Sequence, residues 1–301
     1  MLERSSLQLR RELGELRDPI AILTFIRKNG YNSTAAATLN QFELAHHAEV
    51  VADIPPDEFY DFTVMPPTVR LVDDERVVDW PQNEVRLLPS SPDRPDILTL
   101  AGIEPHLRWP AFAGSIVALL TEHKVGSLVV LRTWPAPVPH TKPSIIRLTT
   151  NDEAVASRLG RTPQITRYEG PVDFGGLVST LFAQSGGVTA GLGAIVPNYL
   201  GVVPNPFAMV ALTEALDRIA GTETSMDELR QHADELRERA NEEMERSSDL
   251  RRAVEQMEDQ YDSVVAAAGG GPTPAEGETA ELPAPDELLR DIEQFLRGSE
   301  D

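Results

Sequence analysis

The sequence predicts an α/β protein: a three-layer α/β/α domain with a mostly parallel central sheet, followed by a C-terminal helical hairpin. Apolar runs of strand length alternate with helical patterns over residues 18–221, which is typical of a layered α/β domain. A highly charged, almost purely helical stretch follows over residues 222–266. With 301 residues, 41% of them hydrophobic, the chain can bury a sizeable core.

The predicted domain opens with a βαβ unit. Residues 19–26 have the composition of a strand, and residues 33–48 form a helical pattern that Ser33 or Thr34 can cap. The next strand is predicted over residues 48–54.

The clearest unit covers residues 96–134. A buried strand is predicted over residues 96–103, a helix from Pro105 to about His123, and a second strand over residues 127–134. Proline suits the first helical position because its missing N–H costs nothing there. We therefore expect two parallel strands with a right-handed crossover.

Three further elements complete the predicted domain. A helix is expected over residues 173–186, a strand over residues 188–196 and a helix over residues 206–220. Consecutive βαβ units imply a mostly parallel sheet that is covered on both faces.

The charged segment allows two arrangements. Apolar residues recur every seven positions over residues 225–264, but Glu243 and Ser247 interrupt the stripe. The residues from Ser247 to Asp249 also resemble a helix cap. We therefore predict two helices folded into a hairpin rather than one long coiled coil.

The two ends of the chain differ from the domain. Residues 1–17 form a short amphipathic arm, and residues 267–285 have the Gly- and Pro-rich composition of a disordered linker. Residues 286–301 contain a short amphipathic helix. That helix either docks on its own domain or engages the groove of a partner.

Composition narrows the classes of function. The chain has no cysteine, which excludes disulfides, thiolate metal sites and a cysteine nucleophile. A net charge of −21 repels phosphate backbones, so nucleic acid is not an expected partner. Neither a membrane span of about 18 apolar residues nor a signal peptide is evident, so we expect a cytoplasmic protein without a membrane partner.

Ligands of such sheets bind beyond the carboxyl ends of the strands. Glu104, Arg108 and His140 follow predicted strands there, and one interpretation is an anion-binding or proton-transfer site. A structural reading is simpler: Glu104 and Arg108 would form an i,i+4 ion pair, and His140 would fix a loop by hydrogen bonds. We name no catalytic residue. The ligand-binding candidates are Asn32, Glu104, Arg108, His140, Lys142, Tyr168 and Tyr199.

Other clusters favour structural roles. The adjacent His46 and His47 diverge by roughly 100° on a helix, so no metal site is expected. The acidic cluster of Asp57, Glu58 and Asp61 is expected to cap a turn or face solvent. Gly186–Gly187 with nearby glycines lacks the dinucleotide-binding pattern, so we predict no cofactor.

Six short motifs, taken together, carry a family resemblance. In chain order they are PDEFYDF (56–62), Trp80–Pro81, GIEPHLRWPAF (102–112), VPHTKP (138–143), YEGP (168–171) and VPNYLGVVPNP (196–206). Their order and spacing resemble the bacterial branch of the proteasome assembly chaperone family, over about residues 18–264. Ser33 stands where relatives carry an aspartate in the first turn.

The resemblance implies an α/β/α fold similar to purine nucleoside phosphorylases. It also implies a homotrimer and protein partners related to the proteasome, since eukaryotic relatives help to assemble proteasome rings. The leading hypothesis is a non-enzymatic assembly-chaperone-like or scaffold protein. The alternative is a binding protein or phosphorylase-like enzyme for a nucleoside-like or anionic ligand at Glu104, Arg108 and His140. A structural role for the C-terminal helices is compatible with the first.

Overall fold

The computed structural model describes residues 7–27, 30, 32–89, 91–165, 167–201 and 203–267. The chain divides into two compact units, residues 1–258 and 259–301, and the fold described here is that of the first. Most of the predicted linker over residues 267–285 and the whole helix predicted within residues 286–301 lie outside the described residues.

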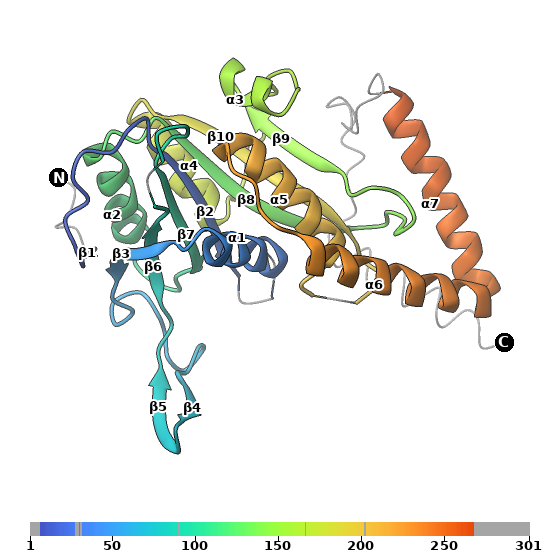
Figure 1. Ribbon diagram of the computed structural model, residues 1–301, viewed down its shortest axis with the longest axis horizontal. Helices are drawn as coiled ribbons and strands as arrows, with labels where there is room; N and C mark the ends of the chain where they lie inside the picture. Colours follow the sequence, from blue (N-terminus) through green and yellow to red (C-terminus); the bar gives the residue numbers. More distant parts are fainter. Residues whose placement is uncertain are drawn as a thin grey trace. The chain divides into compact units, whose positions relative to one another are not determined.

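The main sheet has eight strands in the order β1-β3-β6-β7-β2-β8-β10-β9 (Figure 1). Strands β2, β3, β7, β8 and β10 run in one direction, and β1, β6 and β9 run in the other. The mostly parallel α/β fold is therefore confirmed, whereas the likeness to purine nucleoside phosphorylases stays a prediction. The strands are β1 (Gln8–Leu9), β2 (Ile20–Ile26), β3 (Glu49–Ile54), β6 (Asn83–Leu87), β7 (Ile97–Ile103), β8 (Ser127–Ala136), β9 (Ile146–Thr150) and β10 (Val188–Pro197).

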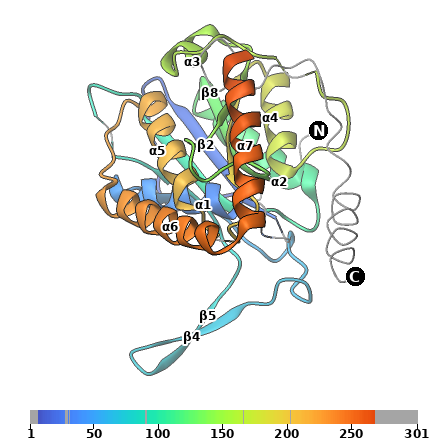
Figure 2. The ribbon, with the colours of Figure 1, turned by 90° about the vertical axis from the view of Figure 1, so that its right-hand side faces the viewer.

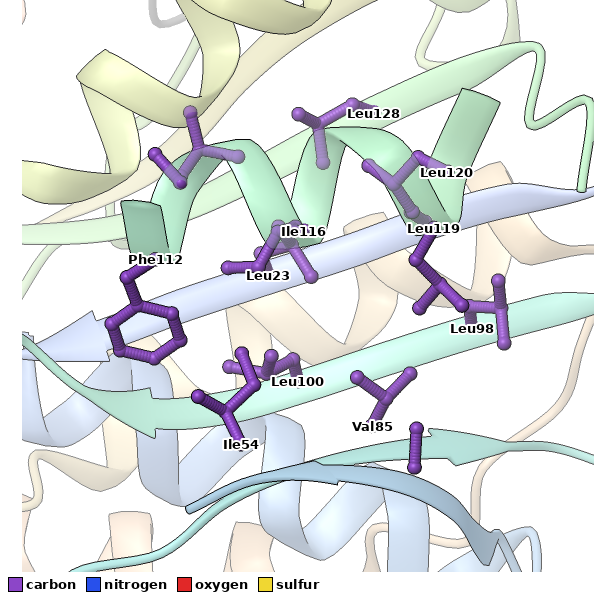
Figure 3. Packing of buried hydrophobic residues seen from close by; sticks show 14 of the residues in the cluster. Leu23, Ile54, Val85, Leu98, Leu100, Phe112, Ile116, Leu119, Leu120 and Leu128 are labelled. Atoms are coloured by element: carbon purple, nitrogen blue, oxygen red, sulfur yellow. The ribbon is translucent and has the colours of Figure 1, made fainter. Parts of the chain in front are cut away.

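One face of the sheet is covered by helices α2 (Trp109–Glu122) and α4 (Phe174–Gln184). The side chains of α2 point onto β2 and β7, where Phe112 and Ile116 meet Leu23 and Leu100 (Figure 3). Phe174 of α4 joins the same core, with its ring centroid 5.1 Å from that of Phe112.

The opposite face carries α1 (Ser33–Ala45), α3 (Glu153–Arg158) and α5 (Pro206–Ala220). Successive strand residues point to opposite faces, so Ile22 packs against this layer while Leu23 packs against the other. No helix within the described ranges is long and apolar enough to cross a membrane.

The predicted start of the second helix is wrong. The helix begins at Trp109, not at Pro105, and Arg108 before it has a left-handed backbone with φ of 53°. Residues 105–108 form a loop instead, in which the amides of His106 and Leu107 donate to the carbonyl of Phe59 at 2.9 and 3.0 Å. The strands on either side are parallel as predicted, with β2 between them.

The described part of the N-terminal arm adds an edge strand. Its strand β1 pairs antiparallel with β3, and Leu7, Leu13 and Leu16 are partly buried against the core. Pattern reading did not predict β1, β6, β9 or α3. It also missed a separate two-stranded ribbon, β4 (Thr68–Val72) and β5 (Glu75–Asp79), which projects from the rest of this unit (Figures 1 and 2).

The charged segment contains two helices, α6 (Asp227–Arg246) and α7 (Ser248–Ala267). Ser247 separates them, and its hydroxyl oxygen accepts a hydrogen bond from the amide of Leu250 at 3.2 Å, as its cap-like sequence suggested. Leu236 on the buried stripe of α6 packs against Phe207 of α5. The hairpin and the other domain boundaries stay predictions.

Candidate functional site

Most of the candidate residues follow the carboxyl ends of parallel strands. The last residues of neighbouring strands lie opposite each other: Ile26 of β2 is paired with Ile103 of β7, and Ala136 of β8 with Pro197 of β10. The loops that follow these strands therefore meet at one edge of the sheet. Asn32, Glu104, His140 and Tyr199 all belong to these loops.

Asn32 joins two strands. Its backbone is left-handed, with φ of 67°, a conformation that asparagine adopts more readily than most residues. The buried side chain donates to the carbonyl of Phe25 and accepts from the amide of Thr133, both at 3.1 Å. Asn32 thus connects the ends of β2 and β8, and its polar atoms are occupied by the backbone.

Glu104 faces the first turn of α4. One carboxylate oxygen accepts from the amide of Phe174 at 3.1 Å, and the other lies 3.4 Å from Nε of Arg27. A carboxylate is favourable at this place because the amides of a helix N-terminus are unpaired. Glu104 therefore attaches α4 to the end of β7.

A second carboxylate occupies the same helix terminus. Asp173 accepts from the amide of Gly176 at 2.6 Å and binds the guanidinium of Arg132 through two contacts of 2.9 and 2.8 Å. Burial by itself raises the pKa of Asp173, but the hydrogen bond and charge of Arg132 outweigh burial and hold the pKa below its ordinary value.

The close approach of α4 to β8 requires glycine. A Cβ atom on Gly175 would lie 2.9 Å from Cγ1 of Val130. The α4 terminus is therefore packed against the sheet and filled by carboxylates of the same chain. This arrangement favours a structural role for Glu104 over the binding of an external anion.

His140 belongs to a different network. Its side chain is buried, with 2% exposed, and Nδ1 lies 2.6 Å from the hydroxyl of Tyr199. The amide of His140 donates to the same hydroxyl at 2.8 Å, and Nε2 lies 3.1 Å from Oδ1 of Asn241 on α6. These distances fit a ring whose Nδ1 accepts from Tyr199 and whose Nε2 donates to Asn241. Burial raises the pKa of Tyr199.

The rest of the VPHTKP segment reaches α7. The hydroxyl of Thr141 donates to the carboxylate of Glu258, and Lys142 lies half-buried next to it. The loop after β8 thus contacts both C-terminal helices through side chains more than 100 positions away in the sequence. Asn241 and Glu258 carried no signal in the sequence that could have identified them.

Arg108 and Tyr168 have other surroundings. Arg108 pairs with Glu58 of the acidic cluster and lies 6.0 Å from the ring of Phe59. The hydroxyl of Tyr168 donates to the carbonyl of Pro171 at 2.8 Å, and 64% of this side chain is exposed. The structure thus joins His140 with Tyr199 and connects Glu104 to α4. That the seven candidates bind a ligand stays a prediction.

The PDEFYDF motif holds the neighbouring strand ends. Tyr60 donates to the carbonyl of Ile103 at 2.6 Å, and buried Asn83 bonds both Tyr60 and the amide of Ile103. Asp61 caps a turn, as predicted, by accepting from the amide and hydroxyl of Thr63. Nothing in the sequence singled out Asn83, whose role depends on contacts across strands.

A cavity of about 300 Å³ lies farther along the same edge, where β3 ends and β6 begins. We call it the Trp80 cavity. Arg10 and Asp53 pair within it at 2.7 Å, and Trp80 packs edge-on against Phe62 with the ring centroids 5.0 Å apart. The residues that line it are Arg10, Asp53, Ile54, Pro56, Asp57, Trp80, Gln82, Asn83 and Glu84. Within the described ranges, no three His, Asp or Glu side chains gather as metal ligands.

Comparisons with known proteins agree with the motifs. A protein of unknown function from Mycobacterium tuberculosis is 24% identical, with a TM-score of 0.75, covering 89% of this chain and 92% of its own. A PAC2 family protein from Streptomyces avermitilis is 27% identical, with a TM-score of 0.66 and coverages of 74% and 95%. A proteasome-assembly chaperone homologue from Mycobacterium tuberculosis is 24% identical, with a TM-score of 0.68 and coverages of 78% and 99%.

No curated protein matches the sequence. The model of the PAC2 family, however, matches residues 35–244, which include Glu104, His140 and Tyr199 at the sheet edge and the lining of the Trp80 cavity from Asp53 to Glu84. The chain therefore belongs to the PAC2 family.

Proposed function

We propose that this chain is a non-enzymatic assembly chaperone or scaffold that binds proteins related to the proteasome and acts as a homotrimer. The proposal rests on the hydrogen bonds that the polar side chains make at the carboxyl edge of the main sheet. Asn32, Glu104 and His140, the polar residues best placed for chemistry, bond to their own backbone and helices. An edge of this kind is a preformed surface rather than a set of reactive groups.

The similar structures support the choice of partner. One of them, described above, is a proteasome-assembly chaperone homologue, and another, from Pyrococcus furiosus, is an archaeal proteasome activator. The second is 18% identical, with a TM-score of 0.58, and shares only the fold at that level. A cytoplasmic location, where such partners would be met, belongs to the same proposal, and cell fractionation tests it.

A binding experiment with purified components tests the proposal. The full chain is mixed with purified proteasome subunits and full rings, and complexes are separated by size-exclusion chromatography with light scattering. We expect a complex with unassembled subunits and faster ring formation in its presence. Absence of binding to both preparations at tens of micromolar would contradict the proposal.

A ligand screen addresses the enzymatic alternative. Nucleosides and inorganic phosphate should leave the thermal midpoint of the full chain unchanged. A reproducible rise that disappears in His140→Ala and persists in His232→Ala, an exposed histidine on α6, would favour a small-molecule site and count against a pure scaffold.

A further inference from the structure

The β4–β5 ribbon has two different faces. Residues opposite each other in the pairing share a face, so Val69 lies beside Val78 and Leu71 beside Arg76. The exposed fractions of Val69, Leu71 and Val78 are 59%, 70% and 47%. The other face is mostly polar, although it includes Val72 and Val77, and it carries an ion pair of 2.6 Å between Arg70 and Asp79.

An apolar face on such a ribbon needs a partner. A two-stranded hairpin by itself is marginally stable in water, because it has no core on which to pack. Here the ribbon forms a sheet of its own and stands away from the main sheet (Figures 1 and 2). Its tight turn at Asp73 and Asp74, with φ of 48° and 66°, matches the twist of the two strands.

The Trp80 cavity of the same chain is complementary to this apolar face. Its other ionic side chains are engaged, since Asp53 pairs with Arg10, and Glu84 pairs with Arg86 at 2.5 Å. Asp57 is exposed and has no ion-pair partner in the described part of the chain. The cavity therefore offers one uncompensated carboxylate beside a tryptophan that is 46% exposed.

The ribbon offers the complementary charge. Arg76 is exposed on the apolar face and makes no hydrogen bond or ion pair with any described residue. A guanidinium next to apolar side chains suits a carboxylate beside an indole, through an ion pair and a cation–π contact. For chains that each carry a charge of −21, such a pair also opposes mutual repulsion at the contact.

The apolar face of the ribbon and the Trp80 cavity cannot meet within one chain. Arg76 lies four residues before Trp80 on a continuous extended segment, a span of about 13 Å. A paired strand does not fold back on itself over this distance, so the tip of the ribbon cannot enter the cavity at its own base. The Trp80 cavity that the ribbon enters must therefore belong to another molecule.

We propose that the apolar face of the ribbon, formed by Val69, Leu71, Arg76 and Val78, docks into the Trp80 cavity of a second copy of this chain. The contact joins two different surfaces, so it is head-to-tail, the type of contact that forms a ring such as a trimer when the rotation between copies closes. The inference rests on the self-association in the proposed function. A face of four side chains is small beside the roughly 20–30 residues per side of a stable interface, so the ribbon acts as an arm within a larger contact.

Sedimentation velocity of the full chain at several concentrations tests the inference. Arg76→Glu and Leu71→Asp should each weaken self-association by about tenfold or more, because a central arginine or apolar anchor is lost. Arg70→Glu is the matched control, with the same charge change on the opposite face, and should leave association as in the parent. Combining Asp57→Arg with Arg76→Glu should restore association, because the two charges are exchanged.

Each contrary result has a distinct meaning. A chain that is monomeric at all concentrations overturns self-association and this inference together, while the binding of proteasome subunits is measured separately. If the parent associates and Arg76→Glu does so equally, only the inference fails. It also fails if Arg70→Glu is as damaging as Arg76→Glu, or if the charge exchange restores nothing.

Discussion

The carboxyl edge of the main sheet and the β4–β5 ribbon differ in where their side chains find partners. At the sheet edge, Asn32, Glu104 and His140 are bonded within the chain. On the ribbon, Leu71 and Arg76 have no such contacts within the described residues. The difference shows that polar residues in the family motifs can serve the fold, while exposed residues outside the predicted site remain accessible to a partner.

Truncation of the core should have the largest effect. Phe112 is fully buried between α2 and the sheet, so Phe112→Ala removes its packing and leaves a cavity. We expect the free energy of unfolding in urea to fall by about 3–5 kcal/mol. Leu71→Ala on the ribbon is the control and should change it by less than about 0.5 kcal/mol. Equal losses would place the ribbon within the cooperative core.

Asn32→Ala should have the next largest effect. It leaves the amide of Thr133 without its partner in a buried place, which costs about 1–3 kcal/mol of unfolding free energy. Asn32→Gly is the informative companion because glycine tolerates the left-handed backbone but restores no hydrogen bond. We expect denaturation to show a smaller loss for glycine than for alanine. An unchanged midpoint for both would show that Asn32 does not connect the strands.

Tyr199→Phe should be milder. It removes a hydroxyl that accepts from the amide of His140 and lies against its ring, at a cost of about 1–2 kcal/mol. Because His140 contacts Asn241 on α6, amide hydrogen exchange should accelerate in α6 more than in α2. Tyr168→Phe, an exposed tyrosine, is the matched control. Equal exchange in both variants would contradict a link between this loop and α6.

The smallest expected effect is a pH dependence of stability that arises from Glu43. It is a buried carboxyl on α1 whose Oε1 has no hydrogen-bond partner among the described residues, and burial raises its pKa above the ordinary value. The folded state then holds a proton more tightly than the unfolded state, so the stability contributed by this group is full at low pH. That stability is lost as pH rises through the folded-state pKa.

Glu43→Gln removes the titration at this buried position. The variant should be more stable than the parent at pH 7, and the difference should shrink as pH falls below about 4.5. Thermal unfolding across pH 4–8 checks this, with the exposed Glu49→Gln as the control. A variant that is less stable at pH 7 would show that Arg86, 3.6 Å away, compensates the charge after all.

Part of the structure was evident without coordinates. The buried strands β2, β7, β8 and β10 and the helices α1, α4 and α5 follow from apolar periodicity, since their side chains must face a core. The break at Ser247 was evident from a local cap. The edge where the strand-following loops meet follows from parallel strands alone.

The rest depended on contacts between distant residues. The ribbon shows no buried periodicity because none of its residues faces a core, so nothing marked it as two strands. Helix α2 begins at Trp109 rather than at the predicted Pro105 because the carbonyl of Phe59 accepts hydrogen bonds from the preceding loop. That His140 bonds Asn241, and that Arg76 lies beyond the reach of its own Trp80 cavity, depends on how the chain is arranged in space. Local sequence determines which residues are buried or extended, whereas only the tertiary structure decides which distant groups meet.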